Sequence, residues 1–131
     1  MPNTDESLLE LIGEFRRAYG RADRERLLAV THPEFEWHMH SSATADEATT
    51  GRVLVGVDNL ITELQWRSAN WSNMNYEDLQ ERPAGDLIVQ TFRVSGTDEN
   101  GENFSVQAVD LYPVKDGKIA MKDTYWKYVR A

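Results

Sequence analysis

The sequence predicts an α+β fold, because its helical segments precede a series of long strands. Apolar side chains recur at helical spacing in three segments before residue 70, whereas four segments after residue 73 alternate between apolar and polar side chains. Turn-forming residues, mainly glycine, proline and aspartate, separate the four strand-like segments. We therefore expect helices gathered on one face of an antiparallel sheet, with a cone-shaped cavity between the two layers.

The first predicted helix covers residues 4–19. Asn3 and Glu6 are three positions apart and fit a capping box at its start, and Gly20 ends it. Its apolar side chains follow helical spacing: Leu8, Leu9, Ile12, Phe15 and Tyr19. We expect this helix to close the cavity over the sheet.

Two shorter helices follow. Residues 23–30 form the second helix with Asp23 as its N-cap, and Pro33 prevents that helix from continuing. Residues 51–56 are a short strand or bend, after which Asp58 is placed to cap the third helix.

Residues 35–40 are the first predicted strand, in which three large apolar side chains alternate with three polar ones. The apolar side chains are Phe35, Trp37 and Met39, and the polar ones are Glu36, His38 and His40. Four longer strands are predicted at residues 73–81, 86–96, 103–115 and 118–129. Asp116 and Gly117 lie between the last two and supply the positive φ that a tight hairpin needs, so we expect these strands to pair antiparallel.

Asp110 interrupts the apolar face of the strand predicted at residues 103–115. Strand alternation places it on the same face as Val106, Ala108 and Tyr112. On the returning strand, one face carries Lys122, Thr124, Trp126 and Tyr128. Because a carboxyl group among small and aromatic side chains is a common feature of catalytic sites, Asp110 is the main candidate for chemistry.

The role expected for Asp110 depends on Lys122. If the Lys122 ammonium reaches it, Asp110 is a carboxylate that abstracts a proton or orients water. If Lys122 instead extends into solvent, burial favours the protonated acid, which donates a hydrogen bond to a substrate carbonyl or protonates a leaving group. A purely structural acid is the third interpretation, and the sequence leaves all three open.

His38 and His40 point to the same side of their predicted strand as Glu36. This arrangement resembles part of a metal-ligand set, but zinc and iron need further ligands that the neighbouring sequence does not supply, so we expect no metal. Either histidine is also a candidate general base at the mouth of the cavity, because imidazole titrates near neutral pH. A local twist or bulge would decide which face they occupy.

The composition is that of one acidic domain. The 131 residues are 40% hydrophobic, which is enough for a single core, so residues 1–131 are interpreted as one domain. The formal net charge of −8 disfavours nucleic acid and anionic membrane surfaces as partners. The chain has no cysteine, which excludes disulfides and thiolate metal sites, and it begins with no apolar run, so we expect a cytoplasmic location.

Three local patterns resemble the NTF2-like superfamily and, within it, the SnoaL-like and ketosteroid-isomerase-like proteins. They are residues 15–23 before a short apolar helix, residues 51–56 before the third helix, and residues 109–112 together with 116–119 and 125–126. The resemblance covers nearly the whole chain. It implies a strongly curved sheet wrapped around the first helix, an apolar pocket, and a homodimer formed through the outer face of the sheet.

The resemblance carries over only in part to the functional positions. Asp110 aligns with the protonated aspartic acid of the isomerase oxyanion hole, and Trp126 aligns with an aromatic residue of the same pocket. The isomerase tyrosine on the first helix aligns with Phe15, which donates no hydrogen bond, and the general-base aspartate aligns with Met39. The usual isomerase mechanism is therefore not expected.

These observations predict an enzyme that binds a small, mostly apolar molecule with a carbonyl, epoxide or hydroxyl group. It would act as an isomerase, cyclase, dehydratase or hydrolase without a cofactor, with Asp110 as acid or base and His38 and His40 as further candidates. The residues expected to contact the ligand are Phe15, Tyr19, Trp37, Met39, Trp66, Tyr112, Lys122 and Trp126. The alternative is a non-catalytic ligand-binding or dimerisation domain, which the two missing isomerase residues favour. The small, polar residues 41–50 are interpreted as a loop and a candidate lid.

Overall fold

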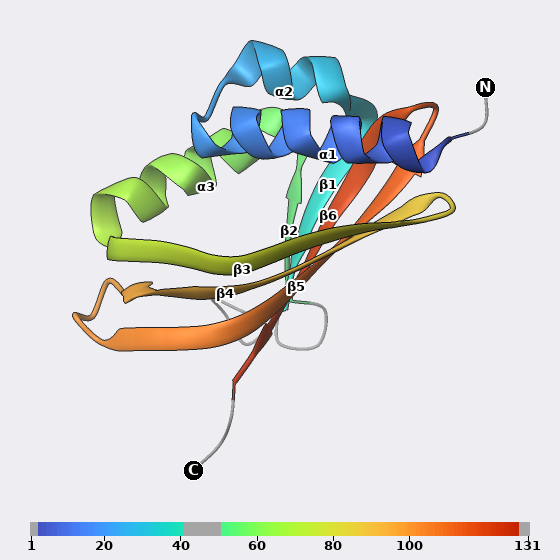
Figure 1. Ribbon diagram of the computed structural model, residues 1–131. Coiled ribbons are helices and arrows are strands. Elements are labelled where there is room, and N and C mark those ends of the chain that lie inside the picture. The colour runs from blue at the N-terminus through green and yellow to red at the C-terminus, as the bar shows by residue number, and fades with distance from the viewer. Residues whose placement is uncertain (1–2, 41–50, 129–131) are drawn as a thin grey trace.

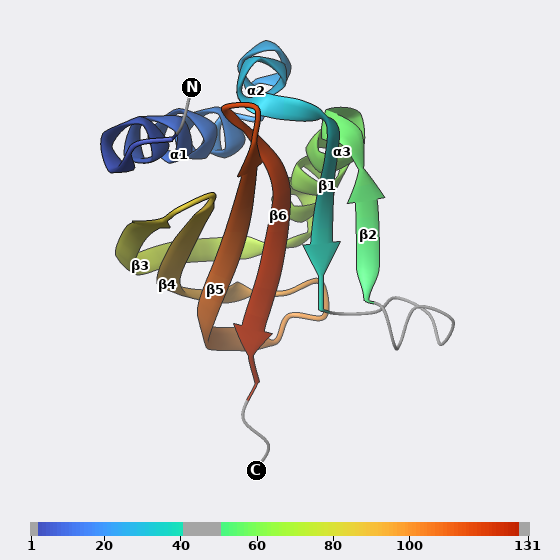
Figure 2. The ribbon, with the colours of Figure 1, turned by 90° about the vertical axis from the view of Figure 1, so that its right-hand side faces the viewer.

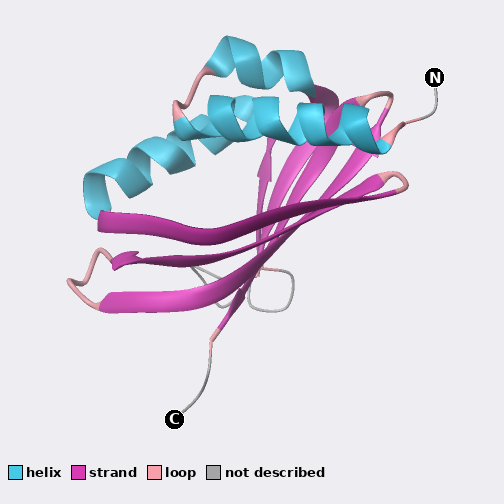
Figure 3. Cartoon of the chain, viewed as in Figure 1, coloured by secondary structure: helices cyan, strands magenta, loops and turns pink. Residues whose placement is uncertain are grey.

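Three helices cover one face of a curved six-stranded sheet (Figure 1; Figure 3). The computed structural model describes residues 3–40 and 51–128 of the chain. Its elements are, in order, α1 (Asp5–Gly20), α2 (Arg24–Val30), β1 (Thr31–Met39), β2 (Arg52–Val55), α3 (Gly56–Asn70), β3 (Ser72–Ala84), β4 (Leu87–Thr97), β5 (Asn103–Lys115) and β6 (Lys118–Lys127). The α+β class is confirmed. The candidate lid, residues 41–50, lies outside the described residues.

The strands lie side by side in the order β2-β1-β6-β5-β4-β3. The run from β3 to β6 is the expected antiparallel meander. The expectation of a wholly antiparallel sheet was wrong, because β1 pairs parallel with β6, as Figure 2 shows. Hairpin turns predict only pairs that are neighbours in the sequence, so this distant pair left no local signal.

The N-terminus of α1 is capped one residue later than predicted. Thr4 is the N-cap: its Oγ1 accepts a hydrogen bond from the Ser7 backbone at 3.0 Å, and the Ser7 Oγ accepts one from the Thr4 backbone at 3.0 Å. Asn3 instead donates to the exposed Asp86 side chain at 3.0 Å. The box is therefore Thr4 with Ser7 rather than Asn3 with Glu6.

The starts of two other elements differ from the prediction. Asp58 is not the cap of α3; it lies in the first turn, where Arg24 Nε contacts its carboxylate at 2.6 Å, and the N-cap is Val55, which makes no side-chain cap bond. Strand β1 begins at Thr31 and includes Pro33. Its pairing with β6 shifts register between Thr31 and Glu36, which accommodates a residue that has no N–H to donate.

Two other local predictions are confirmed. Asp23 caps α2 by accepting from the backbone of Arg26 at 3.2 Å. Asp116 and Gly117 both have positive φ, 53° and 73°, as a tight two-residue hairpin turn requires. Within the described residues, no helix is long and apolar enough to cross a membrane.

The described core consists of two separate clusters. The larger one joins the buried faces of α1, α2 and α3 to β1, β4, β5 and β6 and includes Phe15, Trp37 and Tyr112. The smaller one lies on β4 and β5, beneath the half-buried Trp126. On β1, Phe35, Trp37 and Met39 face inward, so strand alternation was predicted correctly there. The space between the two clusters is where the pocket lies.

Candidate active site

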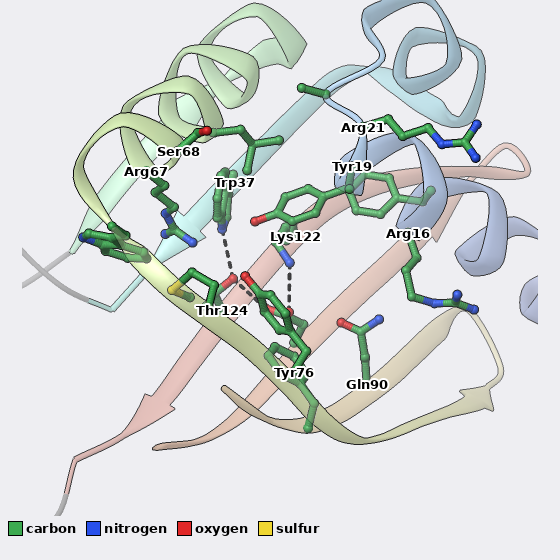
Figure 4. A pocket seen from close by; sticks show the side chains of 18 of the residues that line it. Arg16, Tyr19, Arg21, Trp37, Arg67, Ser68, Tyr76, Gln90, Lys122 and Thr124 are labelled. Atoms are coloured by element: carbon green, nitrogen blue, oxygen red, sulfur yellow. Dashed lines mark hydrogen bonds and ion pairs between the residues drawn. The ribbon is translucent and has the colours of Figure 1, made fainter. Parts of the chain in front are cut away.

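A pocket of about 900 Å³ opens between α1, α3 and the sheet (Figure 4). Many aromatic side chains line it: Phe15, Tyr19, Trp37, Trp71, Tyr76, Phe92, Tyr112 and Trp126. A volume of this size suits a small organic ligand, and aromatic walls favour one with a large apolar surface.

Asp110 lies at the floor of the pocket and is 1% exposed. Its Oδ1 accepts a hydrogen bond from Thr124 Oγ1 at 2.5 Å, and its Oδ2 accepts one from Lys122 Nζ at 2.8 Å. The Lys122 ammonium also donates to the Tyr112 hydroxyl at 2.8 Å. The two oxygens of Asp110 are therefore bonded to a buried lysine and to a hydroxyl, and we refer to Asp110, Lys122, Tyr112 and Thr124 as the floor network.

Strand geometry brings these four side chains together. Asp110 on β5 is directly opposite Thr124 on β6, and the two strands then shift register between Leu111 and Val114. Tyr112 is two residues beyond Asp110 and therefore shares its face. Each strand thus contributes two of the four groups, and a rigid sheet fixes their positions.

The network continues from the floor toward α1. The Tyr112 hydroxyl lies 3.1 Å from Gln90 Oε1 and 3.4 Å from Asp110 Oδ2. Its single proton can therefore be donated to either of these two acceptors. Gln90 in turn donates to Glu81 at 2.8 Å, and Glu81 forms an ion pair with Arg16 of α1 at 3.0 Å. Any group that binds at the floor is thus linked through polar contacts to the helix that covers the pocket.

The Lys122 ammonium is surrounded by aromatic rings. Its Nζ is 4.7 Å from the ring centroid of Tyr19, 5.2 Å from that of Tyr112 and 5.5 Å from that of Trp37. Ring faces attract cations, so they and Asp110 together offset the loss of water around Lys122. Two of its three N–H groups have oxygen acceptors among the described residues, and the third has none there. That third N–H is available to a ligand.

Tyr19 and Tyr112 of the pocket wall are neutral at physiological pH. Burial, with smaller contributions from the charges of Asp110 and Glu63, raises the pKa of Tyr19 to about 12. Burial and the neighbouring Asp110 charge also hold the pKa of Tyr112 well above its ordinary value. Each is therefore a hydrogen-bond donor rather than a base.

A second cation, Arg67 of α3, lies on the other side of Trp37 (Figure 4). Its guanidinium carbon is 4.6 Å from the ring centroid of Trp71, 4.9 Å from that of Trp37 and 5.7 Å from that of Trp126. Glu63, one helical turn earlier, accepts from its Nε at 2.8 Å. Arg67 is therefore fixed among the aromatic walls.

Comparison with known proteins places this architecture in a family. The sequence pattern of the SnoaL-like domain matches residues 12–121. The chain belongs to the SnoaL-like domain family. No curated protein matches the chain.

Solved structures of the NTF2-like fold superpose on this SnoaL-like domain. An NTF2-like protein from Burkholderia xenovorans LB400 has a TM-score of 0.79 at 19% identity, over 95% of this chain and 92% of that one. A candidate SnoaL-like polyketide cyclase from Jannaschia sp. CCS1 has a TM-score of 0.72 at 15% identity, over 97% of this chain and 91% of that one. Another from Mesorhizobium loti has a TM-score of 0.65 at 20% identity, over 90% and 97%. At such identities the likeness shows the shared fold.

Seven of the residues singled out in the sequence line the pocket of this SnoaL-like domain: Asp110, Phe15, Tyr19, Trp37, Tyr112, Lys122 and Trp126. Met39 and Trp66 do not. Met39 is buried beneath the pocket wall, where its sulfur lies 3.3 Å from Arg67 Nη2. Trp66 is 42% exposed on α3 and reaches the site only through its ring contact with Trp71.

Neither candidate histidine lines the pocket. Strand alternation, which continues unbroken from Phe35 to Met39, places His38 on the opposite face of β1, and His40 follows the end of that strand. His38 Nε2 is 3.0 Å from Glu36 Oε1. The exposed His40 stacks on Tyr125, with 3.8 Å between ring centroids, and its Nδ1 is 2.7 Å from the backbone oxygen of Thr124. We therefore leave both out of the site. In the described part of the chain, no three His, Asp or Glu side chains form a metal site.

Among the pocket residues that were not singled out from the sequence are Arg67, Trp71 and Gln90. Gln90 lies opposite Asp110 on β4, which only the strand register reveals. The spacing of four residues between Glu63 and Arg67 is a detectable helical ion-pair signal, but it does not show that Arg67 faces a pocket.

Proposed function

We propose that this SnoaL-like domain is an enzyme that performs acid/base chemistry on a small, mostly apolar ligand with a carbonyl group. The observation that carries the proposal is the floor network, in which a buried carboxylate and a buried ammonium lie 2.8 Å apart in an aromatic pocket. Of the alternatives that the sequence left open, this contact favours Asp110 as a carboxylate base. Epoxide and hydroxyl ligands fit the same groups.

The two charges have complementary roles in the proposed reaction. Asp110 takes a proton from the carbon next to the ligand carbonyl: the C–H bond breaks, an O–H bond forms on Asp110, and the electron pair moves to the carbonyl oxygen. The third N–H of Lys122 binds this oxygen and stabilises the enolate. Lys122 faces one anion before the step, the Asp110 carboxylate, and one anion after it, the enolate. The ammonium is therefore never left uncompensated in the low-dielectric pocket.

The fate of the enolate decides the overall reaction. Return of the proton to another carbon gives an isomer, whereas attack on a second carbonyl closes a ring. Cyclisation is the reaction named for the candidate cyclases from Jannaschia sp. CCS1 and Mesorhizobium loti, which share the fold. Enclosure by aromatic walls supports either outcome, because exclusion of water protects a reactive enolate and strengthens its contact with Lys122.

Proton abstraction can be tested without knowledge of the natural substrate. The protein is incubated in D₂O with 2-tetralone, an apolar bicyclic ketone, and deuterium incorporation next to the carbonyl is followed by NMR. We expect exchange above the buffer rate, and a loss of roughly 100-fold or more in Asp110→Asn, the range that a positioned base contributes. Asp123→Asn is the matched control, because Asp123 is on the opposite face of the same sheet and is bonded to Tyr125.

Either of two results would count against catalysis by Asp110. The first is exchange that survives unchanged in Asp110→Asn. The second is saturable binding of ketones with no exchange at all.

A non-catalytic ligand-binding domain is the second candidate function. The observation that favours it is that every buried polar side-chain atom of the described residues already has a hydrogen-bond partner. A floor of this kind is stable without a ligand and could serve only as a surface to bind one. Saturable binding of an apolar ketone that remains chemically unchanged would support this function.

We also propose that the protein is a homodimer formed through the outer face of the sheet. Val53 and Val55 of β2 and Tyr125 of β6 are 42%, 61% and 40% exposed on that face. Neighbouring β1 contributes Glu36 and His38 to the same surface. Partly apolar sheet faces of this kind favour cover by a second copy.

A further inference from the structure

The pocket has a cationic lining although the chain as a whole is acidic. Four basic side chains line it, Arg16, Arg21, Arg67 and Lys122, and Asp110 is the single acidic residue that does so among the described residues. The formal net charge of the chain is −8. This contrast indicates a ligand with negative charge, provided that the basic groups are not all neutralised by neighbours.

Two of the four basic groups are neutralised. Lys122 forms its ion pair with Asp110, and Arg16 is bonded to Glu81 through two nitrogens at 3.0 and 3.1 Å. Each pair has no net charge. Neither therefore attracts an additional full negative charge from a ligand.

Arg67 belongs to a cluster with an excess of positive charge. Glu63 is 7% exposed and accepts from two guanidinium groups, from Arg67 at 2.8 Å and from Arg52 at 3.0 Å. One carboxylate thus accepts from two cations, so among the described residues the cluster of Arg52, Glu63 and Arg67 has a net charge of +1. Glu99, which accepts from the indole of Trp71 at 2.6 Å, is exposed and does not line the pocket.

Arg67 is the member of this cluster that lines the pocket, and some of its N–H groups have no acceptor among the described residues. Its Nε is used by Glu63 and one Nη2 hydrogen by the Met39 sulfur, whereas its Nη1 has no acceptor among the described residues. Its side chain is only 15% exposed, and Trp71 and Trp37 restrict its orientation. A fixed guanidinium with free N–H groups is suited to a planar carboxylate.

We propose that the ligand is an apolar carboxylic acid whose carboxylate binds Arg67. The proposal rests on the proposed function, in which the ligand's reactive carbonyl lies at Lys122. The Arg67 guanidinium carbon and Lys122 Nζ are 4.9 and 5.5 Å from the same Trp37 ring centroid, so they are at most about 10 Å apart. An aromatic or alicyclic skeleton spans that distance, which defines the substrate class as a cyclic or aryl-substituted keto acid.

A cationic ligand fits the same pocket poorly. Arg67 already lies over the rings of Trp37, Trp71 and Trp126, and Lys122 lies near those of Tyr19 and Tyr112. Ring faces that would attract a ligand ammonium are thus occupied by the protein's own cations.

The test compares two probes that differ only in charge. Naphthalene-2-carboxylate and naphthalene-2-carboxamide have the same apolar ring system, and their binding at pH 7 is measured by isothermal titration calorimetry. The wild type is expected to bind the carboxylate roughly tenfold more tightly than the amide or better, as a charge-assisted bond in a partly buried site provides. This comparison needs no variant.

Three variants locate the anion. Arg67→Gln is expected to bind both probes equally, and Arg67→Lys to keep part of the preference. Arg21→Gln is the matched control, because Arg21 is an exposed residue of the pocket lining that makes no hydrogen bond or ion pair with another described residue. It should keep the full preference. The double variant Asp110→Asn/Lys122→Met removes the neutral ion pair and should also keep the full preference for the carboxylate.

The proposal is overturned if the wild type does not bind the carboxylate, or binds the two probes equally. It is also overturned if the preference for the carboxylate survives in Arg67→Gln. Loss of the preference in the double variant would overturn it as well, since the anion would then lie at Lys122. Binding requires no turnover. A carboxylate preference located at Arg67, together with absent deuterium exchange, would therefore refute the enzymatic function but support the ligand class. Deuterium exchange that depends on Asp110, without a carboxylate preference at Arg67, would support the enzymatic function but refute the ligand class.

Discussion

Asp110 and Lys122 form an ion pair from which water is almost excluded, with the two residues 1% and 5% exposed. A buried pair adds little net stability compared with well-packed apolar side chains, because removing two charges from water is costly. Its presence at the floor of a pocket is therefore better explained by function than by folding. Removal of one partner alone is strongly destabilising, since the other charge is then buried without a counter-charge.

Lys122→Met should strongly destabilise the fold for this reason. The Asp110 carboxylate would keep only hydroxyl partners, and we expect a loss of about 3–5 kcal/mol in the free energy of unfolding. Asp110→Asn/Lys122→Met removes both charges and should recover most of that loss. Urea unfolding at pH 7 measures both variants. A double variant no more stable than Lys122→Met would show that the buried charge is not the cause.

Tyr19 predicts a dependence of stability on alkaline pH. Its pKa is raised from 10.0 to about 12 by burial, so the folded state holds the phenol proton more tightly than the unfolded chain does. The stability from this group is therefore complete below pH 10 and is lost as the pH rises toward 12.

The measurement is urea unfolding at several pH values for wild type and Tyr19→Phe. The difference in unfolding free energy between them should change only in that alkaline window, and subtraction removes the contribution of lysines that titrate there. A constant difference across the window would show that the Tyr19 hydroxyl is not buried in solution.

At the residue scale, the position of Asp110 on the inward face of its strand was predictable from the sequence, whereas its contacts were less so. A charged residue on the apolar face of an alternating strand is visible in one strand alone. The contact with Lys122 depends on the pairing of two strands and on the register shift between Leu111 and Val114, which alternation does not reveal. Arg67 was missed because its importance comes from three tryptophans on different elements.

At the element scale, α1 carries Phe15, Arg16 and Tyr19 into the pocket, so its N-terminal cap also supports the site. Thr4→Ala removes the acceptor for the Ser7 backbone N–H and should lower the unfolding free energy by about 1 kcal/mol. Asn3→Ala is the matched control and should change it by no more than about 0.5 kcal/mol, because Asn3 makes only an exposed side-chain contact. Thermal unfolding distinguishes them, and a larger effect at Asn3 would restore the cap predicted from the sequence.

Most elements were predictable because their signals are local. Apolar spacing located the helices, and Asp-Gly chemistry located the last hairpin. The parallel pairing of β1 with β6 was not predictable, since about eighty residues separate the paired positions His38 and Asp123. This pairing has a functional consequence: it places Trp37 beside Lys122 and lets the Trp37 indole donate to Thr124 at 2.9 Å.

At the scale of the whole molecule, the sheet has two faces with different expected roles. The inner face holds the pocket and the outer face is the proposed dimer surface. Val53→Glu on the outer face should shift a dimer toward monomer, because two copies would then bring like charges together at the interface. Leu28→Glu is the matched control: Leu28 is 46% exposed, but lies on α2, away from that face.

Sedimentation velocity across a range of protein concentrations measures whether the protein is a monomer or a dimer. We expect a dimeric wild type, a dimeric Leu28→Glu variant and a largely monomeric Val53→Glu variant. A wild type that sediments as a monomer at every concentration would refute the dimer.

The central claim is that the reactive oxygen of the ligand lies on the ammonium of Lys122. Infrared difference spectroscopy of bound 2-tetralone, labelled with ¹³C at its carbonyl, tests it most directly, because a charge-assisted hydrogen bond weakens the C=O bond. We predict that the carbonyl stretch lies at lower frequency on the wild type than on Asp110→Asn/Lys122→Met. The same frequency on both proteins, with the ketone bound to each, would contradict the claim.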